Sequence, residues 1–159
     1  MPTKLSMDFT LEELVFSQTA ARNNIDNKPT PQQIRALKSL CACVLQPIRD
    51  ALRVPLVVTS GFRSAALNRT VGGAANSQHL EGKAADLICT AMTSKDLFKR
   101  VLQMNLPVDQ LIYEGGKQSQ WVHISYSSKK PRCEILAATF PLSGGVQYRT
   151  LSMSEAARV

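Results

Sequence analysis

The stretch Ser77-Gln-His-Leu-Glu-Gly-Lys-Ala-Ala-Asp-Leu-Ile88 decides how this chain is expected to fold. A polar loop turns at Gly82 into a predicted strand, Ala84–Ile88, with an acidic residue near its centre. Aspartate is disfavoured there by strand propensity and by burial, so Asp86 requires a compensating partner. A metal ion is one such partner, because the small neighbouring residues let backbone and ion approach closely. An ion pair with a basic side chain is the structural alternative.

The two histidines of the chain, His79 and His123, lie in contexts that suit a metal. His79 belongs to the loop before Asp86. His123 lies in a predicted strand, residues 121–126, whose alternation places apolar neighbours on one face and His123 on the other. Two imidazoles and one carboxylate are a typical ligand set of catalytic zinc, which keeps a fourth position for water. We therefore expect one Zn²⁺ per chain at His79, Asp86 and His123, with hydrogen-bonded structural histidines as the alternative.

Outward from this centre, helix signals precede strand signals. A capping box at Thr10-Leu-Glu-Glu13 predicts one helix start, and Thr30-Pro-Gln-Gln33, with proline at the first helical position, predicts a second. The second helix is expected to continue through a kink at Pro47. Helices followed by clustered short strands predict an α+β fold with a small, mostly antiparallel sheet flanked by helices. The further predicted elements are strands at 56–60, 109–113 and 121–126, the last two joined through Gly115-Gly116, a helix from Thr93 to about Met104, and an edge strand within 132–140.

Length and composition limit the classes of protein to consider. The 159 residues suit a single domain over 1–159, and a hydrophobic content of 44% excludes wholesale disorder. No apolar run is long enough to cross a bilayer. The first ten residues lack the apolar block of a secretory signal, so we expect synthesis in the cytoplasm, and we expect a monomer.

The net charge of +7 favours polyanionic partners, such as nucleic acid, anionic lipid or an anionic cell-wall polymer. Nucleic acid ranks last, because the basic residues do not form a stripe interleaved with aromatic side chains. The clusters Lys129-Lys-Pro-Arg132 and Lys99-Arg100 are expected to be solvated faces that also suit anionic wall polymers. The cysteines are expected to be buried thiols, with a disulfide or a metal site as the alternative, at Cys41, Cys43, Cys89 and Cys133.

The pattern Ser-x-His-x-x-Gly-x-x-x-Asp from Ser77 to Asp86, followed by Trp-x-His at His123, resembles a known zinc signature. It is that of the D-Ala-D-Ala carboxypeptidase and phage endolysin family, which has the hedgehog/DD-peptidase fold. The similarity runs from about residue 9 to 126 and leaves the tail, 132–159, less certain. Phage-type members resemble this chain most, in the blocks Val58-Thr-Ser-Gly-Phe-Arg-Ser64, Leu67-Asn68, Val71-Gly-Gly73 and Ser77-Gln-His79.

The resemblance implies the same zinc ligands and adds roles for other residues. Arg63 matches an arginine that holds a carbonyl or carboxylate of the substrate, a task suited to its two-pronged donor. Ser77 and Gln78 are expected to hydrogen-bond the ligand loop or the substrate.

One departure concerns the catalytic carboxylate. Many relatives place it in a Glu-x-x-His motif, where this chain has Gln120. Glu114 is the expected substitute, as general base and then general acid, with Glu81 and Asp109 as weaker candidates.

The resulting prediction is a zinc peptidase that cleaves peptide bonds of peptidoglycan, as a carboxypeptidase or an endopeptidase. In this mechanism zinc polarises the carbonyl and activates water, while Glu114 transfers the proton and Arg63 fixes the peptide. A phage lysis enzyme or virion component, made in the cytoplasm and acting on the cell wall, fits the missing signal peptide. The alternative is a non-catalytic, zinc-containing peptidoglycan-binding module of the same fold, suggested by Gln120.

Overall fold

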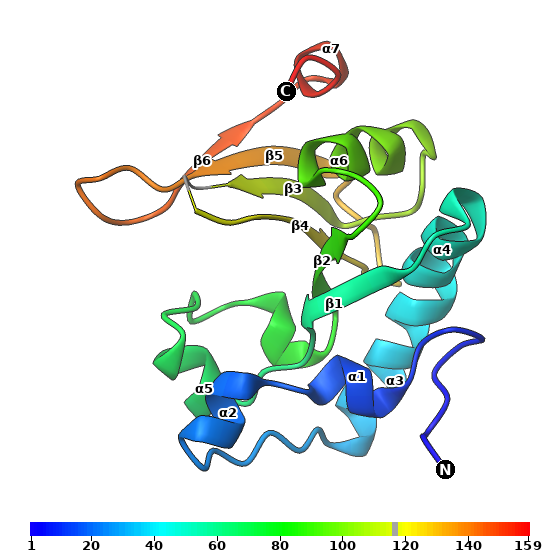
Figure 1. The fold of residues 1–159 in the computed structure, drawn as a ribbon, viewed down its shortest axis with the longest axis vertical. Helices are drawn as coiled ribbons and strands as arrows, with labels where there is room; N and C mark the ends of the chain where they lie inside the picture. Colours follow the sequence, from blue (N-terminus) through cyan, green and yellow to red (C-terminus); the bar gives the residue numbers. More distant parts are fainter. Residues whose placement is uncertain (116–117) are drawn as a thin grey trace.

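A computed structural model describes residues 1–115 and 118–159 of the chain. One six-stranded sheet with the order β1-β2-β4-β3-β5-β6 forms its centre, and helices lie around it (Figure 1). The α+β class and the flanked sheet are thus confirmed. The strands are β1 (Leu56–Ser60), β2 (Ala84–Cys89), β3 (Gln110–Gly115), β4 (Gln120–Ser125), β5 (Glu134–Thr139) and β6 (Gln147–Thr150).

The sheet is mixed, although mostly antiparallel as expected. Among the described strands, each neighbouring pair is antiparallel except β3 and β5, which are parallel. The prediction that residues 132–140 form an edge strand is wrong in one respect: β5 lies inside the sheet, and β6 forms the edge. All four residues of β6 are exposed, so its sequence carries no apolar alternation that would predict a strand. Gly115 ends β3, and Gly116 of the predicted connection lies outside the described residues.

Both predicted helix starts are confirmed, and the structure gives each of them a capping box. Thr10 and Glu13 exchange hydrogen bonds at the start of α1, as do Thr30 and Gln33 at the start of α3. Within the described residues, no helix is long and apolar enough to cross a membrane. The helical elements are α1 (Leu11–Val15), α2 (Gln18–Arg22), α3 (Pro31–Leu40), η1 (Cys41–Leu45), α4 (Gln46–Leu52), α5 (Ala65–Thr70), η2 (Gln78–Glu81), α6 (Ser94–Gln103) and α7 (Met153–Ala156).

The predicted continuation of the helix through Pro47 is also confirmed. A π-helical turn, η1, joins α3 to α4 just before the proline, and the N–H of Gln46 donates to the carbonyl oxygen of Cys41, five residues back. Proline has no N–H to donate to the carbonyl four residues back. The wider turn therefore absorbs the mismatch, and the helix keeps its apolar face on the core.

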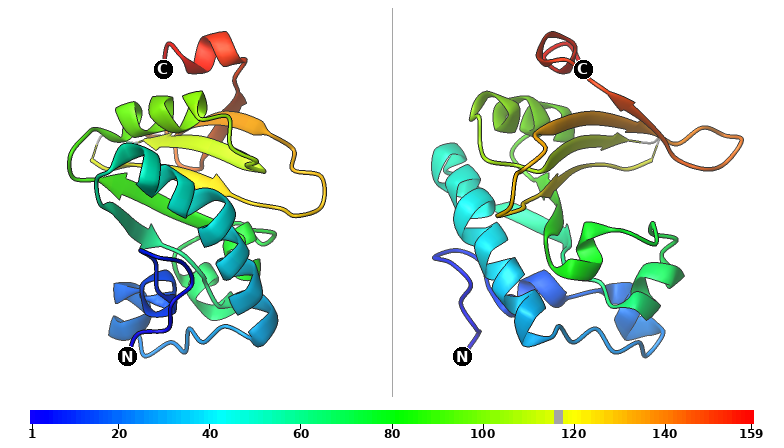
Figure 2. Two further views of the ribbon diagram at one scale, coloured as in Figure 1. Left: turned by 90° about the vertical axis from the view of Figure 1, so that its right-hand side faces the viewer. Right: turned by 180° about the vertical axis from the view of Figure 1, so that it is seen from behind.

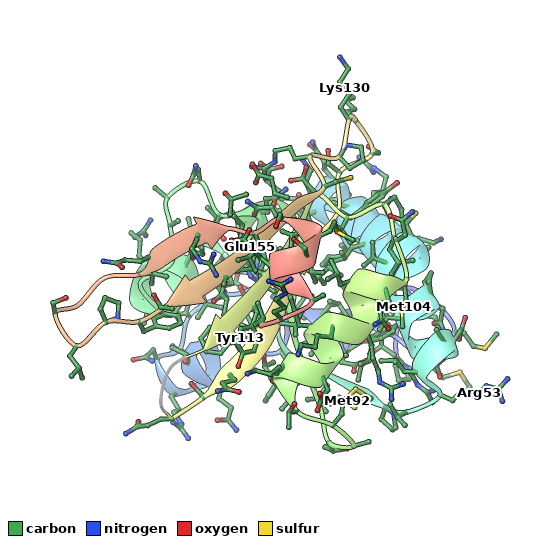
Figure 3. All side chains as sticks on the ribbon, turned by 90° about the horizontal axis from the view of Figure 1, so that it is seen from above. Arg53, Met92, Met104, Tyr113, Lys130 and Glu155 are labelled. Atoms are coloured by element: carbon green, nitrogen blue, oxygen red, sulfur yellow. The ribbon has the colours of Figure 1, made fainter. Side chains whose placement is uncertain are left out.

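The two faces of the sheet have different surroundings. One face packs in the main core against α6 and the α3–η1–α4 segment, which flank the same side in Figure 2. Tyr113 of β3 lies on that face beside α6 (Figure 3), with its ring centroid 5.9 Å from that of Phe98. The opposite face carries Asp86 and His123 with a small apolar cluster of its own.

Cysteines and basic residues follow the predictions only in part. Cys41 and Cys89 are buried, and burial raises the pKa of the Cys41 thiol to about 12, but Cys133 is exposed. The four thiols are free of disulfides in the described parts of the chain. Lys130 extends into solvent as expected (Figure 3).

Gly82 provides a direct test of the turn that joins the loop to β2. Gly82 and Gly72 share a φ of +71°, but a Cβ on Gly82 would lie 2.7 Å from the backbone oxygen of Gln33 in α3, whereas no described atom lies within 4 Å of one on Gly72. Gly72→Ala should therefore cost only left-handed strain, about 1 kcal/mol. Gly82→Ala should lower the free energy of unfolding, measured with urea, by a further 1–3 kcal/mol or so. If both variants lost the same free energy of unfolding, the close approach of residue 82 to Gln33 in α3 would not restrict the side chain at this position.

Candidate metal centre and active-site cleft

Strand register places Asp86 and His123 next to each other on one face of the sheet. Asp86 of β2 is directly opposite His123 of β4, which in turn is opposite Ile112 of β3. Opposite residues in antiparallel strands point to the same face, so these side chains form a row across the sheet. Val122 and Ile124 are fully buried in the main core on the other face, as the alternation predicts.

His79 reaches this row from the η2 turn. The Ser77 hydroxyl begins the turn by accepting a hydrogen bond from the backbone N–H of His79 at 3.3 Å. The ring Nδ1 of His79 lies 2.6 Å from the carbonyl oxygen of Gly61. A neutral ring that donates from Nδ1 to this oxygen keeps the lone pair on Nε2, which faces Asp86 and His123.

Three possible ligand atoms converge on one point. Nδ1 of His123 lies 3.0 Å from Oδ1 of Asp86 and 3.2 Å from Nε2 of His79, and this Nε2 lies 3.3 Å from Oδ1. A tetrahedral zinc ion with bonds of about 2.0–2.1 Å places its ligand atoms roughly 3.3 Å apart. All three residues are buried, and their donor atoms match zinc in type and spacing.

The charge of Asp86 adds to this match. Burial alone would raise the pKa of Asp86, but its contacts with His79 and His123 hold that pKa well below its usual range. The carboxylate is therefore ionised at the centre of the cluster, where it attracts a cation.

Arg63 also pairs with Asp86. Its Nη2 donates to Oδ2 of Asp86 at 2.8 Å, and its Nε donates to the Ser60 hydroxyl at 2.8 Å. The metal and the ion pair are thus compatible partners rather than alternatives, because Oδ1 faces the histidines and Oδ2 faces Arg63. Arg63 also lines the cleft described below, where its predicted contact with substrate stays a prediction.

Glu114 lies on the same face of the sheet, two residue pairs further along β3 and β4. The register pairs it with Trp121, which makes it a diagonal neighbour of His123 at a backbone separation of roughly 7–8 Å. Burial and the negative charge of Asp86 raise the pKa of Glu114, against opposing effects of His123 and Arg63. A buried carboxyl with a raised pKa beside a cleft suits proton transfer near neutral pH.

Gln120 lies on the other face of the sheet. A Cβ built on Gly115 would lie 3.3 Å from Cγ of Gln120, so Gln120 shares the side opposite to Glu114. A carboxylate at position 120 of this sheet would therefore point away from His123. Trp121, whose role the sequence leaves open, is half-buried, lines the cleft and packs on Phe140 with ring centroids 5.7 Å apart.

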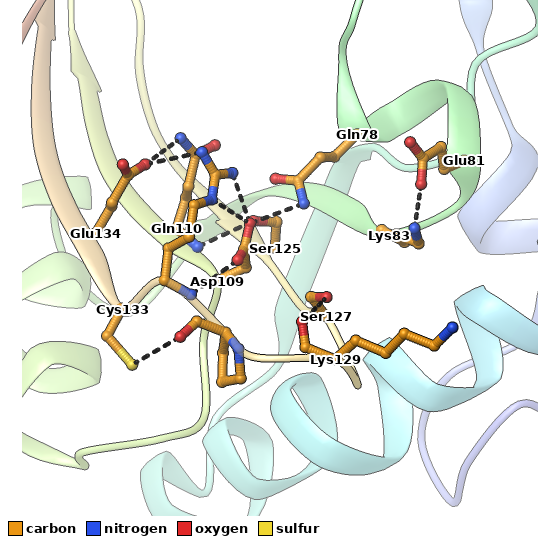
Figure 4. Close-up of polar contacts among 12 residues, drawn as sticks. Gln78, Glu81, Lys83, Asp109, Gln110, Ser125, Ser127, Lys129, Cys133 and Glu134 are labelled. Carbon is orange, nitrogen blue, oxygen red and sulfur yellow. Dashed lines mark hydrogen bonds and ion pairs between the residues drawn. The ribbon is translucent and has the colours of Figure 1, made fainter.

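The two weaker candidates for the base lie outside the row and have other partners. Arg132 donates to Asp109 at 2.6 Å and Gln78 donates to the same oxygen at 2.9 Å; these hydrogen bonds, the one from Arg132 above all, lower the pKa of Asp109 (Figure 4). A carboxylate held in this way is a poor proton acceptor. Glu81 is exposed and pairs with Lys83 (Figure 4).

These hydrogen bonds correct the expectation that Arg132 lies on a solvated face, and they give Gln78 a specific partner. Arg132 is half-exposed, but it is bonded to Asp109 and Glu134 rather than being part of a free solvated cluster. Gln78 lines the cleft, and its amide ties the η2 turn to Asp109 just before β3.

A cleft of about 770 Å³ contains these groups. The segment between α5 and η2 borders it on one side, and the β5–β6 hairpin borders it on the other (Figure 1). The hairpin residues were missed in the sequence, because an exposed strand and its loop give no local signal of lining a site. The lining includes Arg63, Ser77, Gln78, His79, Asp86, Glu114, Trp121, His123, Arg132, Phe140, Val146 and Tyr148.

Comparisons with known proteins agree with this geometry. A stretch of 44 residues is 52% identical to part of the zinc D-Ala-D-Ala carboxypeptidase of Streptomyces albus G. It covers 27% of this chain and 17% of that protein, so the match spans less than a fifth of the relative's length. The profile of the family described as Peptidase M15 matches residues 7–125, most of the chain, including His79, Asp86, Glu114 and His123. The chain therefore belongs to the peptidase M15 family.

Proposed function

We propose that this chain is a zinc-dependent peptidase that cleaves a peptide bond in peptidoglycan, as a D-Ala-D-Ala carboxypeptidase or a stem-peptide endopeptidase. The observation that carries the proposal is the convergence of His79, Asp86 and His123 beside Glu114 in one cleft. Support for D-alanine peptides comes from the name of the partly matched Streptomyces albus G carboxypeptidase.

The metal would be held by His79, Asp86 and His123. Bound there, zinc would supply a Lewis acid for the carbonyl and lower the pKa of a bound water. The chain itself orients the ligands: the Gly61 carbonyl fixes the ring of His79, and Arg63 fixes the carboxylate of Asp86. Such supporting contacts typically change metal affinity or activity by 10- to 100-fold.

Glu114 would carry the proton. Its carboxylate accepts a proton from the attacking water and, once protonated, donates it to the nitrogen of the leaving amine. The site favours this exchange because burial and the charge of Asp86 bring the two protonation states of Glu114 closer in energy. Glu114 also faces the same cleft as the three ligands, within reach of a peptide bound there.

Arg63 would orient the peptide. Its Nε and Nη2 are bonded to Ser60 and Asp86, so the guanidinium plane is fixed at the wall of the cleft. The remaining N–H groups of the fork suit a carbonyl or a terminal carboxylate. Ser77 and Gln78 line the cleft beside it as further polar contacts.

The biological setting is part of the proposal. A phage lysis enzyme or virion component would meet peptidoglycan directly, and the net charge of +7 favours contact with anionic wall polymers. A non-catalytic binding module is less well supported, because Gln120 faces away from the row and Glu114 supplies a carboxylate on the correct face.

The first prediction concerns the metal. The purified protein should bind about one zinc per chain, and Asp86→Ala or His123→Ala should abolish that binding, because each removes one of three ligands. Glu81→Ala on the same turn as His79 should retain zinc, since Glu81 is exposed and paired with Lys83. Zinc analysis by mass spectrometry checks this, and thermal unfolding should occur at lower temperature in the two ligand variants. Unchanged zinc in both would refute the ligand assignment.

The second prediction concerns Glu114. Glu114→Gln should keep zinc and fold while cleavage of peptidoglycan peptides, followed by the release of amino groups, falls about a hundredfold or more. Gln120→Ala should cleave like the wild type because its side chain is on the other face. A wild-type protein that binds zinc and peptidoglycan but releases no amino groups would instead be a binding module.

The pKa of Glu114 tests its position independently of activity. In the metal-free protein its pKa, followed by carboxyl ¹³C NMR, should lie above the ordinary value of about 4.3, since burial and Asp86 both disfavour the anion. Zinc should then lower that pKa, because a nearby cation stabilises the carboxylate. A pKa that does not respond to zinc would place Glu114 away from the metal.

A further prediction concerns Arg63. Lysine keeps the charge but has one ammonium group, so Arg63→Lys cannot bond Ser60 and Asp86 in the present geometry and also hold a substrate carboxylate. At saturating zinc, kcat/KM should fall by about tenfold or more. Ser60→Ala leaves the guanidinium in place and should have a smaller effect. Wild-type kcat/KM in Arg63→Lys would limit Arg63 to a structural partner of Asp86.

A further inference from the structure

Three apolar side chains of the C-terminal hairpin face the candidate site, beyond residues 7–125 that the family profile matches. They are Phe140, Val146 and Tyr148, which we call the hairpin wall. All three line the cleft together with Glu114 and His123. The exposed fractions of Phe140, Val146 and Tyr148 are 40%, 42% and 57%, respectively. Covering these apolar side chains would be favourable, because it removes apolar surface from water.

Strand register brings Tyr148 close to Glu114. Tyr148 of β6 is opposite Ala138 of β5, and Ala138 is opposite Glu114 of β3. These three residues and Trp121 therefore form a second row on the site face, parallel to the row of metal ligands. Because the residue between Tyr148 and Glu114 has only a methyl side chain, no bulky group separates the phenol ring from the carboxylate.

The electrostatics agree with this placement. The pKa of Tyr148 is raised, first by burial and then by the negative charges of Glu114 and Asp86. Charges act in this way only over short distances, because water screens them. Tyr148 thus lies within electrostatic reach of the reacting groups.

The floor beside the wall is apolar as well. Ile112, Leu136 and Ala138 form a small cluster on the site face, separate from the main core. Ile112 and Leu136 also line the cleft. At the other side of the wall, Phe140 packs on Trp121. Floor and wall together make an apolar surface directly next to Glu114, while Arg132 and Glu134 line the cleft elsewhere.

Burial in the core does not account for the wall. Phe140, Val146 and Tyr148 are exposed and lie outside the buried core of the described residues. Leu142, in the same loop, is 95% exposed and does not appear in the described lining of the cleft. Among the exposed large apolar residues of the hairpin, Phe140, Val146 and Tyr148 thus face the site and Leu142 does not.

We propose that the hairpin wall is a specificity-determining subsite, which binds the apolar side chain of a residue adjoining the scissile bond. This inference rests on the proposed peptidase function and specifies its substrate: a peptide with an apolar residue, such as alanine, on the β6 side of the bond. Position supports this occupant, since Ile112, Leu136 and Tyr148 line the same cleft as Glu114 and lie on the same face of the sheet.

The test compares three N-acylated peptides: one ending in D-Ala-D-Ala and two in which either alanine is replaced by glycine. The wild type should cleave one of the two glycine peptides with a kcat/KM roughly tenfold lower than that of the D-Ala-D-Ala peptide. A methyl group in an apolar subsite contributes about that much discrimination. In Phe140→Ala and Tyr148→Ala the ratio between the alanine peptide and that glycine peptide should fall towards one, mainly through KM. Leu142→Ala, on the same hairpin, should keep the wild-type ratio.

Further measurements separate the possible failures. Zinc content and circular dichroism should be unchanged in all hairpin variants, which excludes unfolding as the cause. If the wild type cleaves the peptides but the wall variants keep the full alanine-to-glycine ratio, this inference is overturned and the proposed function stands. If the wild type cleaves none of them, the proposed function fails. Calorimetric binding of the same peptides then decides the inference: a wall-dependent preference for alanine supports it, and an equal affinity or no binding refutes it.

Discussion

The buried carboxylate of Asp86 is the constraint on which the rest of this structure depends. A negative charge in the middle of a sheet must be surrounded by positive charge and hydrogen-bond donors. Three separate parts of the chain supply them: β4 with His123, the η2 turn with His79, and the segment after β1 with Arg63. Gly61 also contributes to this arrangement, because its carbonyl oxygen orients the ring of His79. Only glycine fits at position 61, since a Cβ there would lie 2.2 Å from the backbone oxygen of Leu14.

Much of this centre could be predicted from the sequence, because the signals are local. The caps at Thr10 and Thr30, the strand at 56–60 and the alternation around His123 depend on residues within a few positions of one another. An aspartate in a strand of small residues also indicates its own need for a partner. Arg63 was expected at the site, but its bond to Asp86 depends on the β1–β2 register, which spacing alone does not give.

The parts that could not be predicted depend on pairing between distant segments. Nothing in residues 134–139 specifies a parallel partner in β3, and the exposed β6 has no pattern to identify it. Glu114 is the carboxylate expected from the sequence, but the placement of Gln120 on the opposite face follows only from the pairing of β3 with β4. The pairing of Arg132 could not be predicted because its partners, Asp109 before β3 and Glu134 at the start of β5, lie in separate segments.

The position of the β5–β6 hairpin gives the cleft two parts of unequal local stability. The ligand strands β2 and β4 lie inside the sheet and over the main core, so their amide protons exchange with solvent only in large opening events. Strand β6 has one neighbour, and although Leu151 and Ala156 anchor the chain after it, the loop from 140 to 146 is largely exposed. Rapid exchange is expected there. Under the proposed function, a rigid floor that carries the candidate ligands would adjoin a wall that adjusts to its occupant, and sequence change in the hairpin would alter selectivity without loosening those ligands.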